Sequence, residues 1–213
     1  MTGLFGGAFD PPHNGHLALA RAAIEHFGLE RLVVIPTGVA PHKPVATPGA
    51  VRLRLAAAAF ADVPEAEISS WELDRGVPSY TVETTRWARD RWGEVIFLVG
   101  ADQFAKLDTW HEPDRVLELA RLGVATRPGF EGDPLLRLRS QLTDPSRVEL
   151  FDIEPVPVAS TDVRERIRRG EPVEGLVPPP VADLIAELGL YRDGQSEGPA
   201  GTLERTERGT ENR

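Results

Sequence analysis

Two histidines three residues apart, His13 and His16, lie in a short segment that also holds two glycines and two prolines, GGAFDPPHNGH at residues 6–16. Histidines at this spacing across the start of a helix project from the same side and can donate hydrogen bonds to phosphate oxygens. The free N–H groups and the positive dipole end of such a helix also favour an anion. The segment is therefore predicted to bind a phosphate group.

The residues before the histidines indicate how this segment is built. Gly6 and Gly7 follow an apolar lead, residues 1–5, that has room for one strand. Glycines directly after a strand allow the backbone to come close to a bulky group. The Asp-Pro-Pro run at 10–12 forces a rigid, non-helical turn, and a helix is expected from about Gly15. The pattern is not G-x-G-x-x-G, and it lacks the lysine of a P-loop.

Two other interpretations of His13 and His16 stay open at this point. Histidines at i and i+3 can bind zinc, but a catalytic zinc site needs a third protein ligand, and the chain has neither a cysteine nor an H-E-x-x-H pattern. Alternatively, the two side chains cap and pack a tight turn. We favour the phosphate site because the whole pattern after a first strand is more specific than a lone histidine.

Composition limits the class of protein. The chain has 213 residues, of which 41% are hydrophobic and 27% charged, so we expect one domain over residues 1–191 with a real core. The polar segment 192–213 has no periodicity and is expected to be a disordered tail. Without cysteine there is no disulfide and no thiol nucleophile. With no leader pattern and no apolar run of about 20 residues, we expect a cytoplasmic protein.

The charge balance limits the partners. The net charge is −9, and the basic residues are scattered among more numerous acids, which argues against a nucleic-acid partner. No membrane partner is expected either, because the sequence has no segment that could span a membrane. A small anionic ligand remains compatible if a local pocket gathers basic groups and backbone N–H donors. The sequence leaves the oligomeric state open, a homo-oligomer included.

Apolar segments typical of strands and of helices alternate along the chain. The expected helices are residues 17–27, 51–62, 81–92, 160–170 and 178–191, and the expected strands are 1–5, 32–36, 67–73, 94–100, 121–128 and 147–153. Such alternation predicts an α/β fold, a Rossmann-like doubly wound parallel sheet with helices on both faces. Ligands of such sheets bind beyond the carboxyl ends of the strands. The segments expected there are 6–16, 37–43, 100–110, 127–129 and 160–164.

A family resemblance rests on motifs spread over residues 1–191. GGAFDPPHNGH resembles the G-G-x-F-D-P-x-H-x-G-H signature of the HxGH nucleotidyltransferases. Five further blocks are similar, in order and spacing, to those of bacterial nicotinate mononucleotide adenylyltransferases. They are APHK at 40–43, ELDRGVPSYTVETT at 72–85, FLVGADQFAKLDTW at 97–110, ATRPG at 125–129 and VASTDVRERIRRG at 158–170. The resemblance implies that nicotinate mononucleotide and ATP are joined to give nicotinate adenine dinucleotide and pyrophosphate, with Mg²⁺ arriving with ATP.

The resemblance also implies roles for individual residues. The implied ATP-binding residues are Gly6, Gly7, Ala8, Phe9, His13, Gly15, His16, Gly100, Asp102, Arg127, Ser160, Thr161 and Arg164. The implied nicotinate mononucleotide-binding residues are Lys43, Tyr80, Thr81 and Trp110, and the implied catalytic residues are His13, His16, Lys43 and Arg164. Ser160 and Thr161 are expected at the N-cap of the helix that carries Arg164. Asp102 could equally cap a helix over QFAKL, and both roles are compatible.

The tryptophans are predicted to divide by environment. Trp110 follows a strand in the polar loop LDTWHEP, where an exposed aromatic face can stack on a ligand ring, whereas Trp71, Trp87 and Trp92 are expected in the core.

The chain departs from the family pattern at two places. Ala8 stands where the family often has Thr or Ser, and Val158-Ala159 where it commonly has Ile-Ser. One hydroxyl donor near the phosphates is therefore missing, and backbone N–H groups or Ser160 are left to replace it.

Two other functions compete with this interpretation. Pantetheine-phosphate adenylyltransferase shares the HxGH motif, but it is usually shorter and would not carry PSYT and DTW in these places. A nucleotide-binding regulator without turnover is the alternative from another class. The joint presence of His13, His16, Lys43 and Arg164 argues against it.

Overall fold

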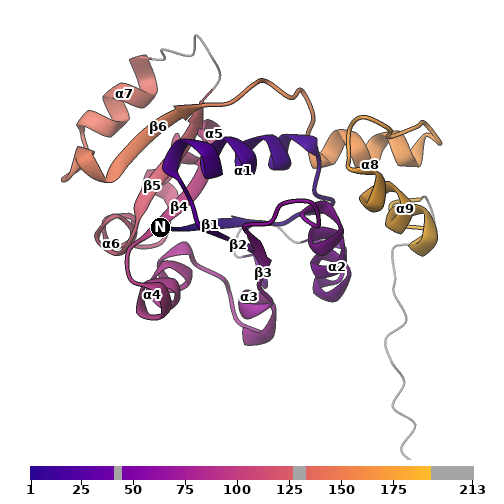
Figure 1. Cartoon of the computed structure of the whole chain (residues 1–213), viewed down its shortest axis with the longest axis horizontal. Coiled ribbons are helices and arrows are strands. Elements are labelled where there is room, and N and C mark those ends of the chain that lie inside the picture. Colours follow the sequence, from indigo (N-terminus) through magenta and orange to yellow (C-terminus); the bar gives the residue numbers. More distant parts are fainter. Residues whose placement is uncertain (41–44, 127–132, 193–213) are drawn as a thin grey trace, which may run out of the picture.

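The fold is built on a six-stranded parallel sheet (Figure 1). The computed structural model describes residues 1–40, 45–126 and 133–192. Its strands are β1 (Thr2–Gly7), β2 (Arg31–Pro36), β3 (Ala66–Ile68), β4 (Val95–Gly100), β5 (Arg121–Thr126) and β6 (Val148–Asp152). The strand order is β3-β2-β1-β4-β5-β6, and each neighbouring pair is parallel. This arrangement confirms the predicted doubly wound sheet.

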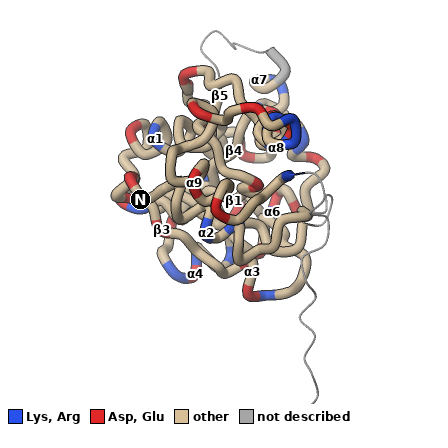
Figure 2. Tube along the Cα trace, turned by 90° about the vertical axis from the view of Figure 1, so that its right-hand side faces the viewer, with Lys and Arg blue, Asp and Glu red and all other residues tan. Residues whose placement is uncertain are grey.

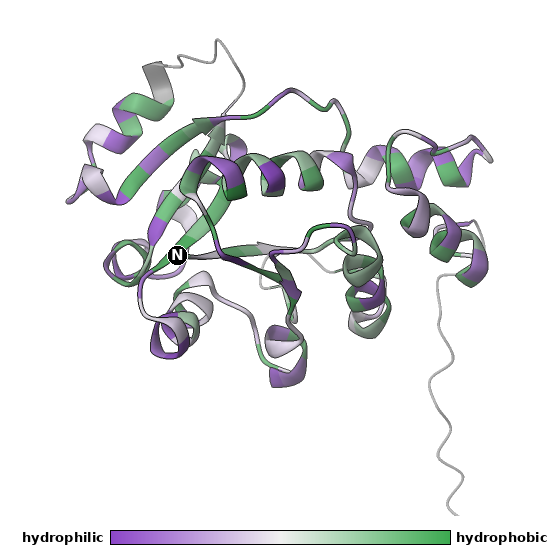
Figure 3. Ribbon diagram, viewed as in Figure 1, coloured by the Kyte–Doolittle hydropathy of each residue, from purple (hydrophilic) through white to green (hydrophobic). Residues whose placement is uncertain are grey.

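The sheet is buried on both faces because helices cover each of them. The helices are α1 (Asn14–Phe27), α2 (Gly49–Ala59), α3 (Trp71–Arg75), α4 (Thr81–Trp92), α5 (Ala101–Phe104), α6 (Pro113–Leu119), α7 (Asp133–Ser140), α8 (Ser160–Arg168) and α9 (Pro179–Leu188), with short 3₁₀ turns η1 (Leu107–Thr109) and η2 (Pro145–Arg147). Helices α1 and α2 pack on one face, with Phe5 and Val34, and α4 and α6 on the other, with Leu4 and Val33. Successive strand residues point to opposite faces, which explains the continuous apolar runs coloured green in Figure 3.

Two C-terminal helices extend the core beyond the sheet. Figure 1 shows α8 and α9 at one end of the molecule, next to α2. Val163 of α8 and Val181 and Ile185 of α9 are buried in the same apolar cluster as α1 and α2. This packing brings the C-terminal part of the described chain to the carboxyl end of β1, which the hydrogen bonds below make explicit.

The prediction of a strand over residues 67–73 is wrong for its second half. β3 ends at Ile68, and Trp71 begins α3. The hydroxyl of Ser69 accepts a hydrogen bond from the amide of Trp71 at 3.3 Å, and the hydroxyl of Ser70 donates to Asp74 at 2.6 Å. Serine hydroxyls that bond locally compete with strand pairing, so the chain turns here. Helix α6, over residues 113–119, was also not predicted from the sequence.

The three tryptophans expected in the core lie at its edge. Trp71, Trp87 and Trp92 are each partly exposed. The rings of Trp71 and Trp87 stack with centroids 4.7 Å apart, and Trp92 meets Trp87 edge-on at 5.1 Å. The guanidinium of Arg75 lies 4.4 Å from the centroid of the Trp71 ring. This row joins α3 to α4 where the core meets the surface. All three rings are partly buried, and Trp87 and Trp92 pack against the apolar cluster that contains Leu4 and Val33, so the prediction of core tryptophans is confirmed only in part.

Candidate active site

The loop between β1 and α1 forms the centre of the candidate site. Phe9 has φ 49°, a left-handed backbone conformation that is uncommon for a residue other than glycine, and its side chain is buried. Its ring packs edge-on against Phe5 at 5.4 Å and against His16 at 5.1 Å. A Cβ on Gly7 would lie 3.2 Å from the Phe9 ring, which explains the second glycine of the motif. The inward ring of Phe9 therefore anchors a loop whose backbone faces the edge of the sheet.

His13 and His16 lie side by side at the start of α1. His13 is the N-cap, and the two rings stack with centroids 3.8 Å apart. The backbone amide of His13 donates to Nδ1 of His16 at 3.1 Å, so a neutral His16 carries its proton on Nε2. A Cβ on Gly15 would lie 3.1 Å from Nδ1 of His13, so this glycine makes room for the ring. The predicted same-side placement of the two histidines is confirmed.

Both histidines are neutral at physiological pH. Burial lowers the pKa of His13 from 6.5 to about 4, although the nearby charge of Asp162 opposes this shift. Burial, and secondarily the proximity of His13, lowers the pKa of His16 well below 6.5. Without a ligand, the two rings therefore contribute N–H donors and no net charge. The fixed positive character at this place comes from the amino terminus of α1 and from arginines.

Helix α8 reaches the same loop from the C-terminal half of the chain. Arg164 donates through Nη1 to the carbonyl oxygen of Asp10 at 2.6 Å, and the hydroxyl of Ser160 donates to the carbonyl of Pro11 at 2.8 Å. Nη2 of Arg164 lies 3.3 Å from the hydroxyl oxygen of Thr161. The structure thus brings together the predicted residues of the first motif and of α8. Figure 2 shows that Lys and Arg positions gather along α8.

The predicted cap of α8 is wrong in detail. Ala159 is the N-cap, and its amide donates to the carboxylate of Asp162 at 3.0 Å. Ser160 is already the first helical residue, and its hydroxyl is directed to the loop after β1. The side chain of Ser160 therefore holds two parts of the site together instead of closing a helix end.

Three polar side chains that support the loop were not predicted to do so: Asp10, which lies in the loop itself, and Arg52 and Tyr191, which lie behind it. Arg52, on α2, is only 3% exposed and donates to three carbonyl oxygens, at 2.9 Å to Ala8, 2.7 Å to Thr37 and 3.1 Å to Thr47. It therefore ties the loop after β1 to the loop after β2. Burial lowers the pKa of Arg52, and the charges of Asp10, Tyr191 and Glu72 oppose this shift. The one indication in the sequence is that Arg52 lies inside a largely apolar helical segment, VRLRLAAAA, unlike the arginines that are scattered over the surface.

The start of α4 lies on the other side of the sheet edge. Tyr80 is the N-cap of α4 and Thr81 its first residue, which confirms the predicted helix start. The centroid of the Tyr80 ring lies 4.5 Å from that of His111, the residue that follows Trp110 in the chain. Trp110 is partly exposed and meets Phe97 edge-on at 6.2 Å, while a Cβ on Gly6 would lie 3.2 Å from the same Phe97 ring. The aromatic residue and the helix start predicted for one substrate are therefore neighbours.

Glu72 is a further buried group that the sequence did not single out. Its carboxylate accepts from the hydroxyl of Thr84 at 2.6 Å and from the amide of Gly38 at 3.3 Å. Burial raises the pKa of Glu72, and these hydrogen bonds partly offset the shift. A Cβ on Gly38 would lie 2.2 Å from the carbonyl oxygen of Glu72, so only glycine allows this close approach. Glu72 therefore joins α4 to the loop that follows β2.

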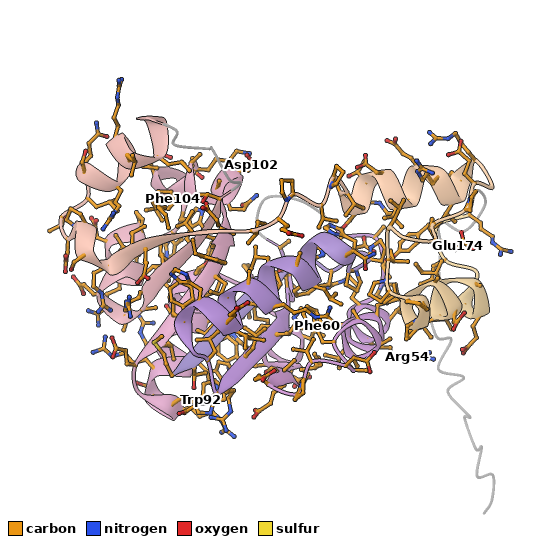
Figure 4. All side chains as sticks on the ribbon, turned by 45° about the horizontal axis from the view of Figure 1, so that its top comes forward. Arg54, Phe60, Trp92, Asp102, Phe104 and Glu174 are labelled. Carbon is orange, nitrogen blue, oxygen red and sulfur yellow. The ribbon has the colours of Figure 1, made fainter. Side chains whose placement is uncertain are left out.

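Of the remaining predicted residues, Gly100 and Asp102 lie in the described part of the chain. Gly100 ends β4, directly beside β1 in the sheet, and it is the N-cap of α5. Asp102 lies in the first turn of α5 and is exposed, so it does not cap that helix (Figure 4). Phe104 fills the apolar side of the same helix. Lys43 and Arg127 lie outside the described residues.

Two other kinds of feature are absent from residues 1–40, 45–126 and 133–192. There, no three His, Cys, Asp or Glu side chains lie together as a metal site would need. Likewise, none of the helices in that part of the chain has the length and apolar character to cross a membrane.

The parallel sheet is open, and its strand order reverses between β1 and β4, where the loop that precedes α1 lies. These features define a nucleotide-binding protein of Rossmann-like architecture. A family model described as cytidylyltransferase-like matches residues 4–166. A "Probable nicotinate-nucleotide adenylyltransferase" of Rubrobacter xylanophilus is 37% identical over 196 residues, covering 90% of this chain and 92% of the relative. The protein of the same name from Thermomicrobium roseum is 38% identical over 205 residues, with 94% and 95% coverage.

A solved structure supports the same fold at low sequence identity. Plasmodium falciparum nicotinic acid mononucleotide adenylyltransferase, complexed with NaAD, superposes with a TM-score of 0.73 at 14% identity, covering 89% of this chain and 96% of that one. The chain belongs to the nicotinate-nucleotide adenylyltransferase family, within the cytidylyltransferase-like nucleotidyltransferases.

The depressed pKa of His13 predicts a pH-dependent stability. Its pKa is about 4 in the folded protein and 6.5 in the unfolded chain, so between these values the unfolded state binds more protons. This contribution is fully present above the unfolded pKa and is lost as the pH falls. Between about pH 7 and pH 5, His13→Asn should lose less free energy of unfolding than the wild type, by on the order of 1–2 kcal/mol.

Urea unfolding at the two pH values measures this difference. His26→Asn, which changes an exposed histidine on the same helix, is the control. An identical pH dependence in His13→Asn and in the wild type would contradict the assignment.

Proposed function

We propose that this protein transfers the AMP part of ATP to nicotinate mononucleotide, giving nicotinate adenine dinucleotide and pyrophosphate. The observation that carries the proposal is the meeting, at one loop, of three elements whose chemistry suits a phosphate. These are the amino terminus of α1, Nε2 of His16 and the guanidinium of Arg164, which is bonded to the loop itself. Membership of the family agrees with this assignment.

The reaction needs positioning more than proton transfer. An oxygen of the mononucleotide phosphate attacks the α-phosphorus of ATP, and the bond from that phosphorus to the bridging oxygen of the β-phosphate breaks. The nucleophile already carries negative charge, so no side chain has to deprotonate it. The neutral imidazole of His16 and the guanidinium of Arg164 stabilise the charge that develops on the transferred and leaving phosphates.

The two substrates are assigned to the two sides of the sheet edge. ATP lies over the loop after β1, with Gly100 and Asp102 toward its ribose and Arg127 toward its adenosine. The nicotinate ring stacks on Trp110, with its carboxylate at the amide groups of Tyr80 and Thr81. Lys43 reaches the phosphates near the reacting centre. Arg52 and Glu72 support this division because each holds the loop after β2 to one of the two half-sites.

The first prediction from the proposed function concerns His16. His16→Ala should fold but lose at least about a hundredfold in kcat, the scale seen when one transition-state donor is removed. Pyrophosphate release from ATP and nicotinate mononucleotide measures the loss, and circular dichroism checks the fold. His26→Ala is the matched control, because His26 lies at the exposed far end of the same helix. Undiminished kcat in a folded His16→Ala protein would contradict the role of this donor.

The same assay separates the competing functions. The wild type should release pyrophosphate with nicotinate mononucleotide and remain inactive with phosphopantetheine. Turnover with phosphopantetheine alone would point to the related pantetheine enzyme, and ATP binding without release from any acceptor would point to a regulator.

The second prediction concerns Mg²⁺, which we propose enters as part of the MgATP substrate and is not held in a protein cage. Activity should therefore disappear with EDTA and return on addition of Mg²⁺ after dialysis. Metal analysis of the dialysed protein provides the second readout. A metal that survives dialysis at one equivalent, and that activity requires, would overturn this proposal.

The third prediction concerns the acid and amide forms of the substrate. The free amide groups at the start of α4 and its positive dipole end favour a carboxylate, whereas a carboxamide brings another donor to a place already rich in donors. Loss of one charge-assisted hydrogen bond of about 1.5–3 kcal/mol corresponds to roughly tenfold to a hundredfold in rate. We expect kcat/KM for nicotinate mononucleotide to exceed that for nicotinamide mononucleotide by at least about tenfold. Equal values, measured side by side, would show that this helix start does not read the carboxylate.

A further inference from the structure

One residue of the loop after β1, Asp10, is held from two directions by the C-terminal part of the chain. The phenol of Tyr191 donates to Oδ1 of Asp10 at 2.7 Å, and Arg164 donates to the backbone oxygen of the same residue at 2.6 Å. Asp10 is 8% exposed, so its carboxylate depends on protein donors more than on water. Tyr191 and Asp10 are 181 positions apart in sequence.

The carboxylate of Asp10 lies among cationic groups that could compete for it. Burial lowers the pKa of Arg52, and the charge of Asp10 opposes this shift. The same charge adds to the rise in the pKa of Tyr191 that burial causes, and the charge of Arg164 opposes that rise. The side chains of Asp10, Arg52, Arg164 and Tyr191 therefore lie in one neighbourhood. Arg52 is committed to three carbonyl oxygens. Arg164 has fewer partners in the protein and is the group that the proposed reaction needs at the phosphates. An unsatisfied Asp10 carboxylate would therefore attract the guanidinium of Arg164 away from the nucleotide.

The backbone at Tyr191 is suited to fixing the phenol in place. Tyr191 has φ 65°, a left-handed conformation that a tyrosine adopts only where surrounding contacts hold it. It follows the end of α9 at Gly189, and its ring packs on the apolar cluster that contains Val181 and Ile185. Burial, and then the charge of Asp10, raise the pKa of Tyr191 above its ordinary value of 10.0, so the phenol remains a donor.

We propose that Tyr191 is a positioning residue for the ATP site: its phenol occupies the Asp10 carboxylate, which fixes the loop after β1 and leaves the Arg164 guanidinium free to bind phosphates. This inference rests on the proposed function in one respect, because it takes Arg164 as a ligand of the nucleotide. It assigns a role to a residue that lies beyond the last motif and touches no substrate.

Tyr191→Phe tests the proposal because it removes one oxygen atom and keeps the ring. The KM for ATP, and the Kd for ATP measured by calorimetry, should rise by about tenfold, whereas the KM for nicotinate mononucleotide should change by less than about twofold. The thermal midpoint should stay within a few degrees of that of the wild type. Ser70→Ala is the matched control: it removes another hydroxyl that donates to a carboxylate, at 2.6 Å, and should leave both constants unchanged.

A second variant distinguishes positioning from mere stability. Asn at position 10 cannot attract Arg164 as a charge does, so in an Asp10→Asn background the change from Tyr191→Phe should shrink to less than about threefold. A wild-type Kd for ATP in Tyr191→Phe would overturn the inference, as would a loss of activity explained by the unfolded fraction alone. Failure of the proposed function would look different, since the wild type itself would then transfer no AMP, while ATP binding by the variants would still test Tyr191.

Discussion

The loop between β1 and α1 depends on donors from distant parts of the chain. Its carbonyl groups at Ala8, Asp10 and Pro11 accept hydrogen bonds from Arg52, Arg164 and Ser160 respectively. A parallel sheet brings the carboxyl ends of its strands to one edge, so loops and helices far apart in sequence meet there. The loop contributes its backbone and its two histidines, and the surrounding helices supply the groups that hold its carbonyls. The carbonyl groups of the loop are therefore satisfied by donors within the protein.

The electrostatic character of the site comes from arrangement more than from net charge. The protein carries a net charge of −9, yet the described part of the site gathers the amino terminus of α1 and the guanidinium groups of Arg52 and Arg164 around one loop. His13 and His16 are neutral because burial lowers the pKa of each. Neutral donors that are held in place need no reorganisation when a polyphosphate binds. A bound anion would favour protonation of the two histidines, so the site can gain positive charge when a ligand binds without carrying that charge beforehand.

Several elements followed from local patterns, and the exceptions have physical reasons. The strands at 32–36 and 94–100 were predictable because a strand buried on both faces must be apolar throughout, and both are present. The segment 67–73 is more polar, with two serines and two glutamates, and its strand ends early because the hydroxyls of Ser69 and Ser70 form local hydrogen bonds where α3 begins. The row of tryptophans was assigned to the core from residue type alone, whereas stacking on Arg75 and on one another stabilises these rings where the core meets the surface.

The sequence by itself determined the parallel α/β class, the turn between β1 and α1 and the helix start at Tyr80, because periodicity and turn chemistry are properties of neighbouring residues. Only the tertiary structure decided what supports them. The local sequence around Asp10, Arg52 and Tyr191 does not name their partners. The contacts that define their roles reach as far as 44 positions for Arg52 and 181 positions for Tyr191. Burial then selects these contacts, because a polar group removed from water must find a partner, and only the folded chain determines which partner is within reach.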